Sequence, residues 1–233
     1  ENFKTITNEA ADLLVGLPGL QVDSRSNFAQ DTRLSIRGFG ARSAFGIRGI
    51  DLIQDGIPIN TPDGQGQLSS IQPGRLESVQ IISGPLSVLY GNSPGGVILM
   101  HSHVTQENRL SLQHAFSDQQ QSWSSLNANI RENNLAIATQ LNYQESETDR
   151  PHSRAQRRQE SLAIYYTTDN QLDWIFKFDQ SRDPLLEDPL GLTPQQFKQD
   201  PFQQNQAAID FNTHKQVENR QISLMLRNRL GET

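Results

Sequence analysis

Apolar and polar residues alternate over much of the second half of the chain, from about residue 109 onward. The longest run covers 135–143, where every odd position except Thr139 carries a large apolar or aromatic residue. A period of two places alternate side chains on one face of a strand, so the pattern predicts strands with one apolar and one mostly polar face. About six such strands are expected, arranged as antiparallel hairpins. The clearest segments are 110–116, 126–130, 135–143, 172–178 and 222–226.

The connections between these segments are unequal in length. Asn133-Asn134 and Asp169-Asn170 are short turn signals, whereas 145–159 and 183–213 are long polar stretches that we expect to be loops. Short turns on one side and long loops on the other are typical of outer-membrane β-barrels, but the alternation by itself favours a soluble β-sandwich equally. The aromatic residues that could form part of a barrel's girdle are Trp123, Tyr143, Tyr165, Tyr166 and Trp174.

The first hundred residues are richer in glycine and in short apolar runs. Asp55-Gly56 separates two apolar segments and predicts a tight hairpin. Residues 10–15 predict a short helix with Asn8 as a candidate N-cap and a stop at Gly16. We expect further short elements at 20–22, 34–37, 50–53, 57–59, 76–82, 85–90 and 95–100. This half of the chain is therefore expected to be a compact, turn-rich module with little room for long helices.

Composition narrows the class of protein. Hydrophobic residues make up 34% of the chain and the mean hydropathy is -0.61, which suits β-structure with one wet face. The net charge of -6 argues against a nucleic-acid partner. Without cysteine there is no disulfide framework and no thiolate metal site. The sequence has no run of 18 apolar residues, so it predicts no membrane-spanning helix.

No constellation for catalysis or for a cofactor is present in the sequence. It lacks a G-x-S-x-G elbow, an H-E-x-x-H helix and a P-loop, and the Gly38-Phe39-Gly40 pattern has no βαβ unit around it. His101 and His103 would share one face of a strand, but two ligands without a third predict no metal centre. We therefore expect a protein that is not an enzyme and that has no metal or cofactor.

An ordered series of glycine-rich motifs stands out in the first half. It runs RGFGARSAFGIRG at 37–49, then DLIQDGIPINTPDGQGQ at 51–67, then SGPLSVLYGNSPGG at 83–96. This series resembles the plug domain of TonB-dependent outer-membrane receptors. The resemblance implies an α+β plug domain at 1–103, with a small mixed sheet and short helices. At 104–233 it implies antiparallel strands that form the N-terminal part of a transmembrane β-barrel. The residues that it assigns to the structural plug motif are Arg37, Gly38, Arg48, Gly49, Asp55, Gly56, Gly84, Pro85, Tyr90, Gly91, Gly95 and Gly96.

Two loops of this module are the candidate ligand site. In the first, Arg42 could bind a carboxylate through bidentate hydrogen bonds, whereas Arg37 and Arg48 are better interpreted as locks between plug and barrel. In the second, side chains with donors and acceptors follow an Asp63-Gly64 turn, although an ordinary exposed turn would look the same. The predicted ligand-binding residues are Arg42, Ser43, Phe45, Asp63, Gln65 and Gln67.

Within the family, the likeness is to the pyrroloquinoline-quinone importer branch, and it continues into GLTPQQFKQDP at 191–201 and FNTHKQ at 211–216. It implies an outer-membrane receptor in a Gram-negative bacterium that imports a scarce anionic solute. Arg42, Phe45 and Gln65 would suit the charge, the ring and the polar groups of that quinone. The energy would come from a TonB-type protein that binds a segment upstream of this chain, and the barrel would contact outer-membrane lipid.

The chain also departs from the family pattern. Gln80 and Ser83 stand where the family usually has an acid and an arginine before the Gly-Pro turn, so a plug salt bridge is lost. About six strands cannot close a barrel around a plug. We therefore expect part of a larger protein or a truncated product that does not transport. The alternatives are an iron-chelate receptor, a binding or signalling module without transport, and a gene remnant.

Overall fold

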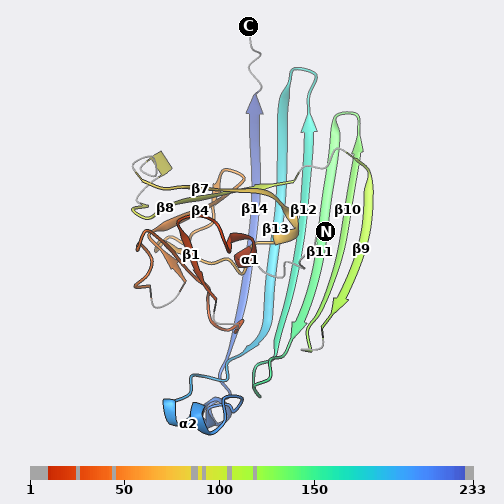
Figure 1. Cartoon of the computed structure of the whole chain (residues 1–233). Helices are drawn as coiled ribbons and strands as arrows, with labels where there is room; N and C mark the ends of the chain where they lie inside the picture. The colour runs from red at the N-terminus through yellow and green to blue at the C-terminus, as the bar shows by residue number, and fades with distance from the viewer. Residues whose placement is uncertain are drawn as a thin grey trace. The chain divides into compact units, whose positions relative to one another are not determined.

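The computed structural model describes residues 10–24, 27–43, 46–84, 89–90, 93–103, 107–117 and 120–228. The chain forms two compact units, Glu1–His103 and Val104–Thr233, and each is described here by itself. Figure 1 shows the short elements of the first unit and the long strands of the second. The described residues contain no helix that is long and apolar enough to cross a membrane.

The first unit is built around a small mixed sheet. Its order is β5-β4-β8-β7, in which β4 and β8 run parallel and the outer pairs are antiparallel. Two two-stranded ribbons, β1-β2 and β3-β6, accompany it. The elements are α1 (Ala10–Leu14), β1 (Leu20–Asp23), β2 (Arg33–Ile36), β3 (Ile47–Arg48), β4 (Ile50–Gln54), β5 (Ile57–Pro58), β6 (Gln65–Gly66), a 3₁₀ turn (Pro73–Arg75), β7 (Leu76–Ile82) and β8 (Gly96–Ser102). The mixed sheet and short helix predicted from the sequence are confirmed.

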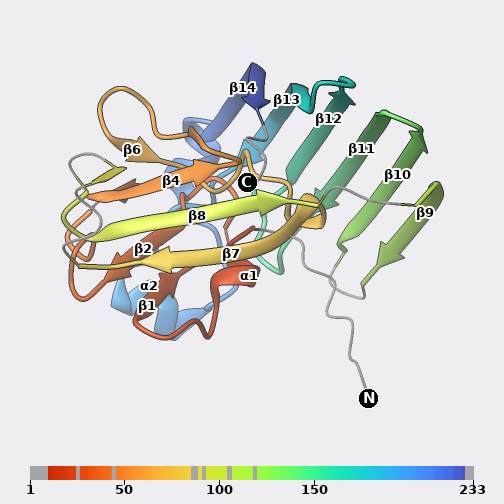
Figure 2. The ribbon, with the colours of Figure 1, turned by 90° about the horizontal axis from the view of Figure 1, so that it is seen from above.

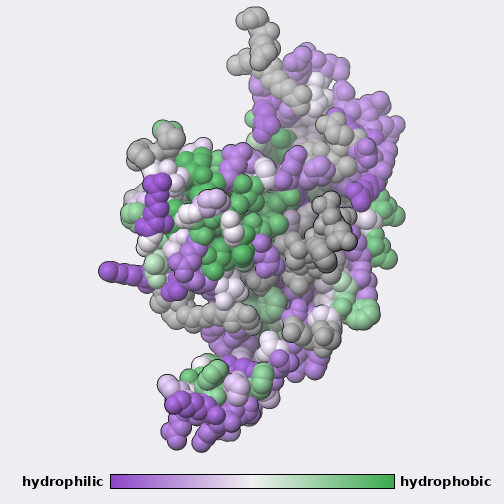
Figure 3. Space-filling model, in the orientation of Figure 1, coloured by the Kyte–Doolittle hydropathy of each residue, from purple (hydrophilic) through white to green (hydrophobic). Residues whose placement is uncertain are grey.

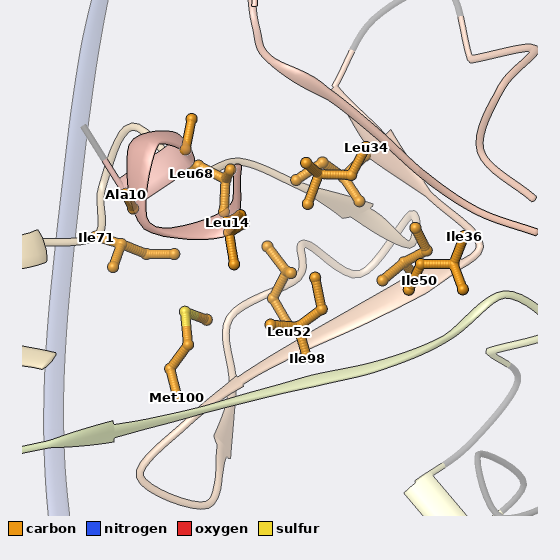
Figure 4. Packing of buried hydrophobic residues seen from close by; sticks show 12 residues of the cluster. Ala10, Leu14, Leu34, Ile36, Ile50, Leu52, Leu68, Ile71, Ile98 and Met100 are labelled. Carbon is orange, nitrogen blue, oxygen red and sulfur yellow. The ribbon is translucent and has the colours of Figure 1, made fainter. Parts of the chain in front are cut away.

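The first unit buries its apolar side chains in one cluster. Leu52 and Ile98, from the parallel pair β4 and β8, are both 0% exposed, and α1 adds Leu14 from the other side. Figure 4 shows these side chains directed toward one another between the helix and the strands. The buried members are Ala10, Ala11, Leu14, Leu34, Ile36, Ile47, Ile50, Leu52, Leu68, Ile71, Ile98 and Met100. The helix is only five residues long, so this packing stabilises it more than its own propensity does.

The second unit is a six-stranded antiparallel sheet in which each strand pairs with its neighbour in sequence. Figure 2 shows the strands following one another along an arc from β9 to β14. The six predicted antiparallel strands are confirmed. Their bounds are β9 (Arg109–Phe116), β10 (Ser122–Glu132), β11 (Leu135–Ser146), β12 (Ala155–Thr167), β13 (Leu172–Glu187) and β14 (His214–Asn228).

One face of this sheet is apolar and exposed. The register joins side chains of the same face into rows; one such row is Ile137, Ile164, Phe176 and Leu224. Leu112 is 77% exposed on this face, and Figure 3 shows hydrophobic side chains along the edge strand β9. The opposite face is polar and largely buried. Its buried polar residues include Ser125, Gln140, Asn142, Gln144, Arg157, Gln159, Ser161, Asp173, Lys177, Ser181 and Asp183.

The two stretches expected to be loops are partly strand. β11 continues to Ser146, β12 already begins at Ala155 and β13 extends to Glu187. The connections are therefore 147–154 and 188–213, and the second contains the helices α2 (Pro194–Gln199) and α3 (Gln206–Asp210). At 145–146 and 156–160 the prediction was wrong because both faces carry polar residues, which removes the apolar alternation that marks a strand. At 183–187 Pro184 and the adjacent leucines Leu185 and Leu186 interrupt the alternation.

The predicted aromatic girdle is also corrected. Tyr143, Tyr166 and Trp174 lie on the apolar face, but Trp123 pairs with Gln144 and Tyr165 with Ala136, both on the polar face. Consecutive residues of a strand point to opposite faces, so Tyr165 and Tyr166 could not both belong to one girdle. The Tyr165 ring instead lies 5.8 Å from the Lys177 ammonium.

Candidate functional site

Two loops of the first unit bring several predicted ligand residues together. The loop after β2 ends in β3, and the loop after β5 ends in β6; the two short strands pair through Ile47↔Gly66 and Arg48↔Gln65. The segments at 37–49 and 60–67 therefore lie side by side. Phe45, which we predicted to stack on a ligand, lies outside the described residues.

The shape of the first loop depends on backbone geometry that favours glycine. Its entry is a tight turn in which the Ile36 amide donates to the Phe39 carbonyl at 3.0 Å and the Phe39 amide donates back at 2.9 Å. Arg37 and Gly38 inside this turn have φ of 50° and 84°. At Gly40, also at positive φ, a Cβ would stand 2.3 Å from the Leu34 carbonyl oxygen. A side chain cannot be accommodated there without moving the loop.

Arg33 holds the middle of the first loop in place. Arg33 donates to the Ala41 carbonyl at 3.2 Å and forms an ion pair with Asp23 at 2.8 Å. The hydrogen bonds from Arg33 and Gln21 lower the pKa of the Asp23 carboxyl. Arg42 follows this anchored segment, is exposed, and makes no hydrogen bond or ion pair within the described residues. Its guanidinium is therefore available to an incoming anion.

In the second loop, Asp63 organises its own neighbours. Its carboxylate accepts from the Thr61 hydroxyl, from the Gln65 amide at 3.4 Å and from Arg48 at 3.4 Å. The Thr61 hydroxyl is the largest cause of a lowered Asp63 pKa, followed by the Gln65 amide. The carboxylate is thus ionised at neutral pH and holds the turn that Gly64 completes with φ of 79°. In this arrangement it contributes to the shape of the loop.

Gln65 links the two loops. A Cβ on Gly46 would be 2.5 Å from the Gln65 side-chain nitrogen, so the amide lies directly against the backbone of the first loop. Arg48 donates to the Gln65 oxygen at 3.5 Å as well as to Asp63. The acidic partner of Arg48 among the described residues is therefore a residue of the same unit, whereas we had expected an acid of the barrel. Gln67 follows β6 and is half-buried.

The motif at the end of the first unit leaves little space around its glycines. The Gly95 amide donates to the Gly49 carbonyl at 2.8 Å, and a Cβ on Gly95 would lie 2.7 Å from that oxygen. Gly96 has φ of 131°, and its Cβ would lie 2.6 Å from the Ile82 carbonyl oxygen. Gly84 also has positive φ, at 93°, and Tyr90 is exposed. The other two predicted motif residues, Pro85 and Gly91, lie outside the described part of the chain.

The predicted Asp55-Gly56 hairpin has a further role that the sequence did not reveal. Asp55 accepts from the Ser102 amide at 2.7 Å and from its hydroxyl at 2.6 Å, at the last residue of β8. Asn60 similarly accepts from the Leu52 amide at 2.7 Å and donates to the Ile50 carbonyl at 3.1 Å. The Asp55 contact could not be read from spacing, because Ser102 is 47 positions away in the sequence.

A second candidate surface is the polar face of the six-stranded sheet. Arg157 and Asp183 form a bidentate pair at 2.9 and 3.2 Å, and their side chains are 7% and 2% exposed. The Gln140 oxygen and the Ser161 hydroxyl, neighbours in register, are buried without a hydrogen-bond partner. Sequence analysis missed this surface, although the even positions of 136–146 mark it with small and polar residues. Its amides and hydroxyls can hydrogen-bond a polar solute or another polar surface.

Both surfaces carry side chains that can bind a ligand through hydrogen bonds and charge. In the part of the chain that the structure describes, no group of three or more His, Cys, Asp or Glu could hold a metal ion. His101 and His103 are both exposed, and the Glu77 carboxylate lies 4.0 Å from the His103 ring. Arginines, amides and hydroxyls that bind and orient an anion are present in the loops.

Comparison with known proteins shows which proteins the chain resembles. Residues 4–97 match the family described as the TonB-dependent receptor plug domain. A stretch of 102 residues is 29% identical to the vitamin B12 transporter BtuB of Vibrio vulnificus, which corresponds to 43% of this chain and 15% of that protein.

Solved structures share the fold at low sequence identity. The ferric enterobactin receptor PfeA matches 95% of this chain and 36% of its own, with a TM-score of 0.68 and 14% identity. The siderophore receptor PirA of Acinetobacter baumannii matches 78% of this chain and 30% of its own, with a TM-score of 0.58 and 18% identity. The chain thus spans about a third of these solved receptors. The match extends from the plug over strands of a partial barrel, as expected.

Proposed function

Because residues 4–97 match the TonB-dependent receptor plug domain, we propose that the protein is an outer-membrane active-transport receptor. It binds a scarce small solute and imports it with energy from a TonB-type protein. The observation that carries the proposal is the order of parts: a plug domain is followed directly by an antiparallel sheet with an exposed apolar face and a polar one. In such a receptor the ligand biases the plug between two arrangements, and the outside energy source does the work.

The apolar face is the surface that contacts membrane hydrocarbon in this proposal. On β11 the face runs from Leu135 to Tyr143, or roughly 27 Å along the strand. With the tilt usual for barrel strands this corresponds to about 21 Å of height, close to the ~25 Å apolar band of outer-membrane barrels. Tyr166 and Trp174 lie on the face beside the short turns, where an aromatic girdle supports one membrane boundary. The long connections then face the outside of the cell.

For the solute, we infer a small anion that meets the two plug loops. Arg42 supplies the charge, and Ser43 and Gln65 supply hydrogen bonds beside it. Asp63 and Arg48 keep the second loop in shape. Pyrroloquinoline quinone, with three carboxylates on a planar ring, suits this set, and Phe45 would stack on the ring. An iron chelate is the alternative, which the names of the relatives favour: one is a siderophore receptor and another a ferric enterobactin receptor.

A binding experiment separates these solutes. Protein extracted from outer membranes is titrated with pyrroloquinoline quinone and, separately, with ferric chelates. Arg42→Ala should weaken quinone binding about tenfold or more, because a charge-assisted pair to a carboxylate is lost. Arg109→Ala is the matched control, since this exposed arginine lies at the start of β9 in the other unit. Unchanged quinone affinity in Arg42→Ala would remove the assigned role, and tighter binding of a ferric chelate would favour the alternative solute.

Localisation tests the broader proposal. The protein should fractionate with outer membranes, separated by density from inner membranes and from periplasm. Uptake of the bound solute should cease when the proton motive force is dissipated, because the import step depends on inner-membrane energy. Solute uptake that continues at the same rate without this force would contradict active transport.

A further inference from the structure

The long connection 188–213 of the second unit is folded although it has almost no core. Among its residues, all of which the structure describes, only Pro189 and Ala208 are buried. Large apolar side chains lie on its outside instead: Phe211 is 79% exposed and Phe197 61%. Apolar packing therefore contributes little to its order, while a long connection loses much conformational entropy when it takes one shape. Polar contacts must supply most of the compensating free energy.

Arg150, in the shorter connection 147–154, makes three of these polar contacts. Its Nε atom donates to the Gln203 carbonyl at 2.9 Å, and its Nη2 atom donates to the Leu190 carbonyl at 2.8 Å and to the Pro189 carbonyl at 3.2 Å. The guanidinium is half-buried and has no acidic partner in the described part of the chain. It therefore joins the beginning of the long connection to its middle, through hydrogen bonds that the positive charge strengthens.

The two ends of the long connection are joined to each other and to the same short connection. The Asp188 amide donates to the Thr213 carbonyl at 3.0 Å, and the Thr213 hydroxyl donates to the Asp188 carbonyl at 2.7 Å. The His152 Nε2 atom lies 2.9 Å from the same Thr213 carbonyl. A carbonyl only accepts, so this nitrogen carries the hydrogen. His152 thus holds the end of the long connection, and Arg150 holds its beginning and middle.

The contacts inside the long connection meet at the carbonyls that Arg150 binds. The Asn205 amide donates to the Pro189 carbonyl at 3.0 Å, and the Asn205 side chain donates to the Gly191 carbonyl at 3.0 Å. The Pro189 carbonyl thus accepts from both Asn205 and Arg150. Figure 1 shows the helix α2 of this connection beyond the ends of the long strands, where the sheet does not support it. Loss of the Arg150 guanidinium should therefore release most of the connection.

We propose that Arg150 is a positioning residue for solute capture: it holds the connection 188–213 in one shape, which keeps the route of the solute open. It acts through the connection and does not touch the solute. The inference rests on the proposed function, in which the solute arrives from the side of the long connections. It also gives a role to the motifs at 191–201 and 211–216, which the plug loops do not use. A released connection adopts many shapes, and those that block the route lower the rate of association.

Hydrogen–deuterium exchange of the outer-membrane protein in detergent tests the hold on the connection. Arg150→Ala should accelerate exchange in 189–210 about tenfold or more, because charge-assisted hydrogen bonds to three carbonyls are lost. Arg150→Lys keeps the charge, but an ammonium cannot span both stretches, so it should recover only part of the protection. Exchange in β11–β13 should stay as in the wild type, which shows that both variants are folded. Unchanged exchange in 189–210 of Arg150→Ala would overturn the proposal.

The matched control is an arginine of the same short connection. The Arg154 side chain donates to the Glu145 carboxylate at 2.9 Å and not to the long connection. Arg154→Ala should therefore leave exchange in 189–210 at the wild-type rate. The same acceleration in Arg154→Ala as in Arg150→Ala would mean that any loss of charge loosens the connection, which contradicts the role of Arg150.

Binding kinetics test the effect on capture, with pyrroloquinoline quinone and ferric chelates as separate probes. In Arg150→Ala we expect association to slow about three- to tenfold, while the dissociation rate and the number of sites per protein stay unchanged. Misfolding would instead lower the number of sites. If the wild type binds a probe and the variant associates equally fast, or differs only in dissociation, the positioning role alone is overturned. A wild type that binds neither probe contradicts the proposed function itself.

Discussion

The two units of the chain use apolar residues in opposite ways. In the first unit Leu52 is 0% exposed and belongs to a closed cluster between α1, β4 and β8. In the second unit Leu112 is 77% exposed, and the buried positions of the sheet hold amides, hydroxyls and charges. The first arrangement is that of a water-soluble domain. The second is stable when the exposed face meets hydrocarbon and the polar face meets water or other polar groups.

This difference explains why mean composition was a poor guide to either unit. Both units are rich in strands, but only the second has long regular alternation, because each of its strands separates two different environments. The short strands of the first unit are interrupted by glycines that the tight packing requires, as at Gly95 against the Gly49 carbonyl. Variants in the two units should therefore differ in their effect on stability.

The largest effect is expected at the buried charges of the second unit. Asp183→Leu removes the carboxylate that pairs with the buried Arg157 guanidinium, which should lower the free energy of unfolding by about 3–5 kcal/mol. The double variant Arg157→Met/Asp183→Leu should regain most of this loss, because neither charge of the pair then remains buried. Urea unfolding in detergent micelles measures both. A double variant as unstable as the single one would mean that the pair organises the polar face in a way that apolar packing cannot replace.

In the first unit the sensitive positions are apolar. Leu52→Ala removes a fully buried side chain from the cluster in Figure 4 and should cost about 2–5 kcal/mol of stability. Leu112→Ala makes the same chemical change on the exposed face, where no cavity forms, so its effect should be within about 0.5 kcal/mol. The rate of protease cleavage in the first unit measures the effect of Leu52→Ala, and urea unfolding measures the effect of Leu112→Ala. Equal losses of stability in the two variants would contradict the distinction between the units.

The sequence predicted this contrast better than it predicted the details of either unit. Alternation at 135–143 and 172–178 indicated the right strands and the right apolar face, because a period of two is a local property. The strand end at Ala155 was missed because both faces are polar in the residues that follow it, and the end at Glu187 was missed because Pro184 and two adjacent leucines interrupt the alternation. Thr193 and Gln196 have the spacing of a capping box and form one at the start of α2, although the sequence analysis predicted a loop there. The Asp55–Ser102 contact joins residues 47 positions apart, and no local pattern reveals it.

A charge on the apolar face tests whether that face lies in lipid. Leu224 is 64% exposed in the middle of the rows, and Leu224→Arg should destabilise the protein in lipid vesicles by about 2–4 kcal/mol. Asn219→Arg adds the same residue to the opposite, polar face of β14 and should change stability by no more than about 0.5 kcal/mol. Urea titration of vesicle-reconstituted protein measures both variants. A tolerated arginine at position 224 would mean that this face meets water, as in a soluble sandwich.

The smallest effect concerns acid and the plug loops. The Thr61 hydroxyl, the Gln65 amide and Arg48 lower the pKa of Asp63 below its ordinary value of 3.8, so the folded loop favours the ionised carboxylate. Stability from this group is therefore fully present above about pH 4 and is lost as the pH falls through the lower, folded pKa. Hydrogen exchange in 60–67, corrected for the intrinsic rate, should accelerate below pH 4. In Asp63→Asn this acceleration should disappear, whereas Asp200→Asn, on an exposed helix end of the other unit, should retain it. Because Asp63 is exposed, the effect should stay within the loop and leave the apolar cluster of the first unit unchanged, which again separates the surface of that unit from its core.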